Sequence, residues 1–251
     1  MLKTLLTFAC LLALAAPALA QAPADDKPVV KLANPLGVVA GSTVKVVLRG
    51  FKLDETKEVK CSDGKSTAKV LVAKNADTLN MQDPKRVGDR QVELELTIPA
   101  DAPVGQLGLV VVTPKGESAP YMIDVGGDLP VIEDKEANDG FRQAQAIQLP
   151  QIVNGAIHGD RNVDCFVFDA QAGQKIVADV FADRRGANLD ALLTLYSDRG
   201  VVIASHDDLP DSRDARLETT LPAAGKYYLV LQDAHDLGGA ASPYRLVVKP
   251  Q

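Results

Sequence analysis

The chain has 251 residues, a formal net charge of −6, and an aromatic content of 4% with no tryptophan. Residues 21–130 hold 15 acidic and 14 basic side chains, and residues 131–251 hold 18 and 12, so neither half has a basic surplus. Because nucleic acids and anionic lipids are bound through basic patches, we expect neither as a partner. The scarcity of aromatic rings also weighs against a sugar site built by stacking.

The first twenty residues have the pattern of an export signal. Lys3 supplies the positive start, the apolar run from Leu5 to Ala16 is too short to span a bilayer, and Ala18-Leu19-Ala20 fits a small-x-small cleavage site. We therefore predict a signal peptide at residues 1–20 and a disordered start at residues 21–28. The mature chain is expected in the periplasm or outside the cell, without a membrane span.

Residues 29–126 contain short apolar runs separated by turn signals, which is the spacing of a β-sandwich. Val92, Leu94, Leu96 and Ile98 alternate with polar residues, as in a strand with one buried face. We predict an immunoglobulin-like β-sandwich here, followed by a Gly- and Pro-containing linker at residues 127–130.

Residues 131–251 contain eight strand candidates, which suits a jelly-roll sandwich. Phe141 to Ile147 has the spacing of one or two helical turns. The predicted fold class is therefore all-β, with two β-sandwich domains, immunoglobulin-like and then jelly-roll, after a signal peptide. The strand candidates are Ile152–Ile157, Val163–Phe168, Ile176–Phe181, Leu192–Tyr196, Val201–Ser205, Leu217–Leu221, Lys226–Gln232 and Tyr244–Val248.

Two cysteines follow the predicted signal peptide, one in each predicted domain. Exported proteins usually oxidise their thiols, so a disulfide between Cys61 and Cys165 would clip the domains together. The alternative is two separate buried thiols, since a small apolar side chain fits the position of Cys165 in its strand.

Aspartate dominates the acidic residues of the second half, where it accounts for 15 of the 18. Aspartate is a poor strand former and a good turn former, and its carboxylate is a hard oxygen ligand that suits Ca²⁺. The pattern indicates a β-scaffold whose loops could hold a metal. No nucleophile elbow, His-Glu-x-x-His motif or glycine-rich phosphate loop accompanies it, so we predict no catalytic residues and no organic cofactor.

The second half resembles the bacterial pre-peptidase C-terminal domain, a secreted jelly-roll module. The family opens with Glu-x-Glu-Pro-Asn-Asp, and this chain has Asp134-Lys135-Glu136-Ala137-Asn138-Asp139, so Asp134 and Ala137 depart from the pattern. Further similar stretches follow in family order: Val153-Asn154-Gly155, Gly159-Asp160, Val163-Asp164-Cys165-Phe166, Ala172-Gly173-Gln174, Leu189-Asp190, Asp207-Asp208, Gly225-Lys226-Tyr227-Tyr228 and Tyr244-Arg245-Leu246.

The first half is similar, more loosely, to immunoglobulin-like domains of the IPT/TIG kind. The similar stretches are Pro35-Leu36-Gly37, Gly41-Ser42-Thr43, Arg49-Gly50-Phe51 and the run from Ile98 to Gly105. The pairing of the two modules looks like exported proteins of planctomycete-type bacteria.

The resemblance to the bacterial pre-peptidase C-terminal domain implies a Ca²⁺ site. Alternate residues of an extended stretch point the same way, so side chains of the opening motif can converge. The alternative is a solvated acidic linker in which Asn138 and Asp139 cap the turn that starts at Phe141. The ligands implied by the resemblance are Asp134, Glu136, Asn138, Asp139, Asp160 and Asp164.

A second polar cluster consists of His206, Asp207, Asp208, Asp211 and Asp214. We interpret it as a solvated loop that pairs with the nearby Arg213 and Arg216. A second Ca²⁺ site, or catalysis by His206, remains an alternative.

These features favour an exported, non-catalytic module for binding, adhesion or targeting, stabilised by Ca²⁺. Its partner would be an extracellular protein or polysaccharide that the sequence does not identify. The alternative function is that of an accessory subunit, such as a chaperone or inhibitor, of a secreted hydrolase.

Overall fold

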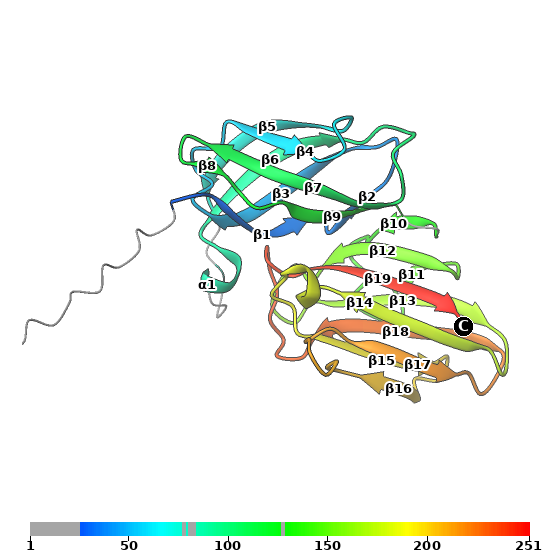
Figure 1. Cartoon of the computed structure of the whole chain (residues 1–251). Coiled ribbons are helices and arrows are strands. Elements are labelled where there is room, and N and C mark those ends of the chain that lie inside the picture. Colours follow the sequence, from blue (N-terminus) through cyan, green and yellow to red (C-terminus); the bar gives the residue numbers. More distant parts are fainter. Residues whose placement is uncertain (1–25, 77–78, 80–83, 127–128) are drawn as a thin grey trace, which may run out of the picture.

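The computed structural model describes residues 26–76, 79, 84–126 and 129–251. Its strands fall into two units along the chain: an N-terminal unit with one large sheet, and a C-terminal unit with two five-stranded sheets (Figure 1). Nearly all the regular structure is strand, which confirms the predicted all-β fold. The predicted signal peptide, and the first residues of the predicted linker, lie outside the described residues. No helix in the described ranges is long and apolar enough to cross a membrane.

The N-terminal unit is a nine-stranded sheet with the order β1-β3-β6-β5-β4-β7-β9-β2, and β8 pairs with β7. Its strands alternate as predicted, because Val92, Leu94 and Leu96 of β6 are fully buried in its core. The elements are β1 (Val29–Asn34), β2 (Gly37–Val38), β3 (Thr43–Phe51), β4 (Glu58–Cys61), β5 (Thr67–Asn75), α1 (Pro84–Val87), β6 (Arg90–Thr97), β7 (Gly105–Thr113), β8 (Gly116–Glu117) and β9 (Tyr121–Val125).

The outer face of this sheet carries a charged row centred on Glu93 of β6. Its carboxylate oxygens lie 2.5 Å from Lys45 Nζ on β3 and 2.8 Å from Lys74 Nζ on β5. Hydrogen bonds from these two lysines lower the pKa of Glu93 to about 2.

The C-terminal unit has the strand pairing of a jelly roll. Strands β12-β19-β14-β17 form one sheet and β13-β18-β15-β16 the other, while the short β10 and β11 add in parallel to β12 and β13. All eight predicted strands are present. The elements are β10 (Val131–Glu133), β11 (Gln145–Ala146), β12 (Gln151–Ala156), β13 (Val163–Ala170), β14 (Lys175–Phe181), η1 (Asp183–Arg185), β15 (Ala191–Ser197), β16 (Val202–His206), β17 (Arg216–Thr220), β18 (Gly225–Asp233) and β19 (Pro243–Pro250).

The helical turns predicted at Phe141 to Ile147 are wrong. The segment forms turns and then the short strand β11, which pairs with β13. The Phe141 ring stacks on Tyr228 with 4.5 Å between centroids and meets Tyr196 edge-on at 5.2 Å. Packing against the outer face of a sheet therefore decides the conformation.

Both described cysteines are free thiols, which agrees with the second of the two alternatives. Cys165 is fully buried in β13, and burial together with the neighbouring Asp164 charge raises its pKa to about 12. Cys61 lies half-buried in β4 of the other unit, where burial raises its pKa to about 11.

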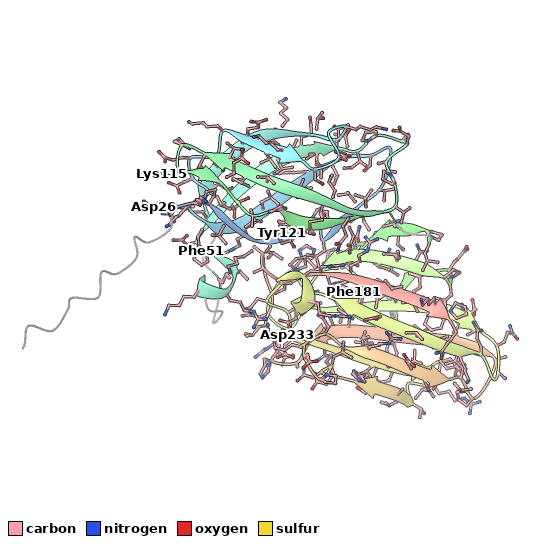
Figure 2. The ribbon with its side chains drawn as sticks, viewed as in Figure 1. Asp26, Phe51, Lys115, Tyr121, Phe181 and Asp233 are labelled. Carbon is pink, nitrogen blue, oxygen red and sulfur yellow. The ribbon has the colours of Figure 1, made fainter. Side chains whose placement is uncertain are left out.

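The two units pack directly against each other. Leu32, Leu36 and Val87 of the N-terminal unit belong to the same buried apolar cluster as the jelly-roll core. Tyr121 lies where the units face each other, and its hydroxyl donates to the carbonyl of Arg185 at 2.8 Å (Figure 2). The same arginine forms an ion pair with Asp124 at 3.0 Å, which fixes η1 against β9.

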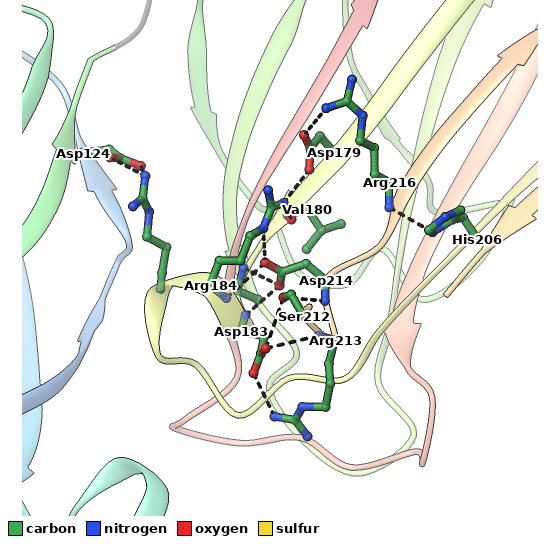
Figure 3. Close-up of polar contacts among 12 residues, drawn as sticks. Asp124, Asp179, Val180, Asp183, Arg184, His206, Ser212, Arg213, Asp214 and Arg216 are labelled. Atoms are coloured by element: carbon green, nitrogen blue, oxygen red, sulfur yellow. Dashed lines mark hydrogen bonds and ion pairs between the residues drawn. The ribbon is translucent and has the colours of Figure 1, made fainter. Parts of the chain in front are cut away.

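Asp214 anchors η1 from the jelly-roll side (Figure 3). Its fully buried carboxylate accepts hydrogen bonds from the backbone N–H groups of Ala182, Asp183 and Arg184, and from Arg184 Nε at 2.6 Å. The predicted solvated loop is therefore wrong at this position, since the backbone of another segment neutralises the charge.

The arginines of the second cluster also pair outside it. Arg213 contacts Asp183 at 3.4 Å and Asp190 at 3.7 Å. Arg216 contacts Asp179 of the neighbouring strand β14 at 3.4 Å, and Glu218 of its own strand β17 at 2.7 Å. The expectation of a loop that pairs with its own arginines is wrong, because these side chains pair with acidic residues of β14, β17, η1 and the segment before β15.

Replacement of Glu93 tests the charged row. Because the folded-state pKa is depressed, the ion pairs stabilise the fold above pH 4.5, the ordinary value, and this contribution disappears as pH falls toward 2. Glu93→Gln should lower the free energy of unfolding by about 1 kcal/mol near neutral pH and by less than half of that near pH 2. Urea denaturation at several pH values measures this, with Glu95→Gln as the control on the same strand. An equal loss at both ends of the pH range would contradict the pairing.

Replacement of Asp214 tests the anchor of η1. Asp214→Asn should destabilise the fold by about 3 kcal/mol, because an amide cannot accept four N–H donors and the change removes the buried charge that pairs with Arg184 Nε. Asp211→Asn, in the exposed part of the same loop, should change stability by less than about 0.5 kcal/mol. Equal effects of the two changes in thermal unfolding would argue against the anchor.

Candidate metal centre

The loop at residues 134–140 joins the two sheets of the jelly roll. At its start, the Asp134 N–H donates to the carbonyl of Asn154 on β12 at 2.8 Å. Near its end, the Asn138 carbonyl accepts from the Cys165 N–H on β13 at 3.0 Å, and the Phe141 ring then packs on the sheet. Both ends are thus fixed, so the side chains between them are held over one end of the sandwich.

Buried polar side chains meet beneath this loop. Asn138 and Asp164 are fully buried, and Asn138 Nδ2 donates to Asp134 Oδ1 at 2.7 Å. The Tyr244 hydroxyl from β19 donates to Asp164 Oδ2 at 2.6 Å. A glycine is required at position 155, because a Cβ there would lie 2.3 Å from the tyrosine oxygen and 2.8 Å from Asp134 Cβ. Strand β12 therefore leaves room for the two acids.

Three oxygens of this cluster are buried and have no hydrogen-bond partner among the described residues: Asp134 Oδ2, Asn138 Oδ1 and Asp164 Oδ1. Buried polar atoms without partners are rare in native proteins and costly. Oxygens of two carboxylates and one amide are the ligands that a hard cation takes. The residues present therefore fit a bound Ca²⁺ ion.

The electrostatics of the cluster also favour a positive ion. Burial, followed by the charges of Asp134 and Glu136, raises the pKa of Asp164 to about 8. Burial and the Glu136 charge likewise raise the pKa of Asp134, and burial near Asp164 raises that of the Tyr244 hydroxyl. The like charges thus oppose one another, and either protons or a cation must offset them.

Glu136 and His158 form the exposed rim of the cluster. Their side chains approach to 3.3 Å between Oε1 and Nε2. Together with Asp134 they offer three ligand atoms that lie within 4.8 Å of one another. The imidazole suits transition metals better than Ca²⁺, so the rim is chemically softer than the buried oxygens.

The structure brings together four of the six ligands implied by the resemblance: Asp134, Glu136, Asn138 and Asp164. Asp139 points away from its neighbours in the loop, and its exposed carboxylate accepts from Asn162 Nδ2 at 2.9 Å. Asp160 is exposed in the turn before β13 and belongs to neither of the ligand groups found in the described residues.

Three participants were not predicted from the sequence in these roles. Tyr244 and Gly155 appear in the sequence analysis only within the stretches that carry the resemblance, but the tyrosine is fully buried against Asp164 and the glycine leaves space beside it. His158 carries no motif of its own in the sequence and is placed beside Glu136 by the fold. One signal in the sequence could have placed the tyrosine. Tyr244, Leu246 and Val248 alternate along β19, which indicates that all three side chains face the core.

The second acidic group, Asp190, Asp207 and Asp208, is compensated by the protein itself. Its members offer oxygens within 4.8 Å of one another. Arg213 Nη1 and His235 Nδ1 lie 3.7 and 3.6 Å from the Asp190 carboxylate. None of these three acids has a buried oxygen without a partner within the described ranges, so the group lacks the feature that marks the first cluster.

An open cavity of about 800 Å³ lies beside the loop, between β10 and β11. The Gln145 amide bridges its walls, accepting from the Lys135 N–H at 2.8 Å and donating to the Glu133 carbonyl at 3.0 Å. The edge of β10 is thus already hydrogen bonded at this point. The lining residues are Ile132, Glu133, Lys135, Glu136, Ala137, Gln143, Gln145, Ala146, Gln148 and Gln151.

Several known proteins are similar to parts of this chain. A probable subtilase-type serine protease of Deinococcus radiodurans is 29% identical over 215 residues, which are 83% of this chain and 29% of the protease. The chain thus spans less than a third of the length of this curated relative.

The solved structures that match parts of this chain have low identity and low TM-scores. The pre-peptidase C-terminal domain of a Bacillus anthracis collagenase has 19% identity and a TM-score of 0.35, covering 42% of this chain and 94% of that domain. PliG of Aeromonas hydrophila, a periplasmic inhibitor of g-type lysozyme, has 17% identity and a TM-score of 0.33. The match covers 49% of this chain and 97% of PliG.

The family model described as bacterial pre-peptidase C-terminal domain matches residues 162–233. This range contains Asp164 and strands β13 to β18, whereas the loop that supplies the other candidate ligands precedes it. A pre-peptidase C-terminal domain is therefore supported at residues 162–233.

Proposed function

We propose that the chain is an exported, non-catalytic binding or targeting module whose jelly roll is stabilised by Ca²⁺. The observation that carries this proposal is the set of three buried oxygens without partners on Asp134, Asn138 and Asp164. Asp134 and Asn138 belong to the loop and Asp164 to β13, so a shared cation would tie the two ends of the loop to the sheet beneath it.

The bound ion would supply charge neutralisation and fixed geometry. Ca²⁺ takes six to eight oxygen ligands at about 2.3–2.6 Å, and the three buried groups with Glu136 would provide part of this set. The Tyr244 hydroxyl orients Asp164, and Asn138 Nδ2 orients Asp134. A hundredfold excess of the ion over its dissociation constant would add about 2.7 kcal/mol of stability, a large share of an ordinary domain's margin.

The non-catalytic assignment is supported by the matched family and by the extent of the similarity. The family takes its name from a domain beside a peptidase, and the matched protease is more than three times as long as the region it shares with this chain. In the part of the chain that the structure describes, the histidine beside the candidate site is His158, and it is paired with Glu136. An attached or accessory role outside the cytoplasm fits these features.

The cavity beside the loop supports a polar ligand for this module. Four glutamines line it, and their amides both donate and accept hydrogen bonds. None of the described residues that line it is aromatic, so a bound polysaccharide or protein segment would be held by hydrogen bonds.

Removal of the metal tests the proposal. Addition of Ca²⁺ to chelator-treated protein should raise the melting temperature by roughly 5–10 °C at a hundredfold excess over the dissociation constant. Differential scanning calorimetry measures the shift, and elemental analysis of the purified protein measures the bound ion.

Matched variants locate the effect. Asp164→Asn and Asp134→Asn should abolish the shift, because each removes a buried carboxylate that would bind the ion. Asp139→Asn and Asp160→Asn should keep it, because these side chains lie outside the cluster. If added Ca²⁺ leaves the melting temperature of the wild-type protein unchanged, and elemental analysis finds no bound metal, the proposed Ca²⁺ site is contradicted.

A further inference from the structure

Strands β12 and β19 form a wall between the candidate metal centre and the N-terminal unit. Consecutive side chains of a strand point to opposite faces. The register partners Gly155 and Tyr244 face the cluster, where the tyrosine hydroxyl meets Asp164. The adjacent partners Asn154 and Arg245 face the N-terminal unit. One layer of backbone therefore separates the two sites.

Strand β10 repeats this arrangement at the start of the loop. Asn154 Nδ2 donates to Glu133 Oε1 at 3.2 Å on the side of the N-terminal unit. The next residue, Asp134, belongs to the cluster, and its N–H donates to the carbonyl of the same asparagine. Strands β12 and β19 thus each place one residue at the metal centre and the adjacent residue at the contact between units, and the last residue of β10 with the first residue of the loop does the same.

The contact itself depends on a buried arginine. Arg245 is 4% exposed, and burial lowers its pKa. Nη1 donates to Asn154 Oδ1 at 2.8 Å and Nη2 donates to the carbonyl of Gly126. Asn154 Nδ2 also donates to the carbonyl of Gly37 at 3.2 Å. The guanidinium is thus held by neutral oxygens whose positions must be fixed, since a buried charge is stable only when its hydrogen bonds are satisfied.

We propose that cation binding at the cluster and docking of the two units are coupled. An ion that fixes Asp134 and Asp164 also fixes β10 and the Asn154–Arg245 pair, and so tightens the contact with the N-terminal unit. This inference rests on the proposed Ca²⁺ site. Because coupling is reciprocal, a change that loosens the contact from the N-terminal side must weaken Ca²⁺ binding by the same factor.

Gly37→Ala tests the coupling from a distance. A Cβ at this position would lie near Arg245 Nη1, so the new methyl group displaces the guanidinium without touching a candidate ligand. Isothermal titration calorimetry of the chelator-treated full chain should show Ca²⁺ affinity at least about fivefold weaker than wild type. Gly108→Ala, on β7 beside Ser62, is the matched control and should bind within about twofold of wild type.

A second pair of variants tests the same coupling without relying on Gly37→Ala. Arg245→Met removes the guanidinium and should weaken Ca²⁺ binding, whereas Arg216→Met on the same sheet should not. Wild-type affinity in both folded variants, Gly37→Ala and Arg245→Met, would overturn the coupling while leaving the metal site intact. Absence of Ca²⁺ binding to the wild-type protein would overturn the site itself, and the coupling with it.

Discussion

Asp164 is fully buried at one end of the jelly roll and Asp134 is half-buried beside it, and as carboxylates each keeps a buried oxygen that accepts no hydrogen bond from the described residues. The two acids lie within hydrogen-bond reach of each other, so a shared proton or a cation would satisfy these oxygens. Burial of like charges is unfavourable, and their raised pKa values express that cost. The surrounding structure nevertheless holds them in place through Asn138, Tyr244 and the space left at Gly155. The proposed function follows from this constraint, because a divalent cation removes the cost and uses the geometry already present.

The same strands connect this centre to the other unit. A sheet has two faces one residue apart, so a site on the inner face of β12 and β19 has immediate neighbours on the outer face. Here the outer neighbours, Asn154 and Arg245, are the residues that bond to the N-terminal unit. The shared apolar cluster around Leu36 makes this contact continuous with the jelly-roll core. Local order at the loop and the relative placement of the units thus depend on the same backbone.

Local patterns in the sequence were sufficient to predict the strands of the jelly roll, because alternation and turn residues act over a few positions. They also placed Asp134 and Asn138 on one side of the loop. They failed for Phe141 to Ile147, where stacking on a distant sheet overrides helical spacing. They also included Asp160, which the turn before β13 leaves exposed. They missed the role of Arg245, which bonds to Asn154 in its own unit and to the carbonyl of Gly126 in the other. Contacts between distant segments are not encoded in local periodicity.

The most direct measurement is anomalous X-ray diffraction from crystals of the full chain grown with millimolar CaCl₂. A bound Ca²⁺ ion should give a peak within about 2.3–2.6 Å of Asp134 Oδ2, Asn138 Oδ1 and Asp164 Oδ1. The absence of such a peak, with these three oxygens hydrogen bonded to water or to protein donors instead, would contradict a cation at this site.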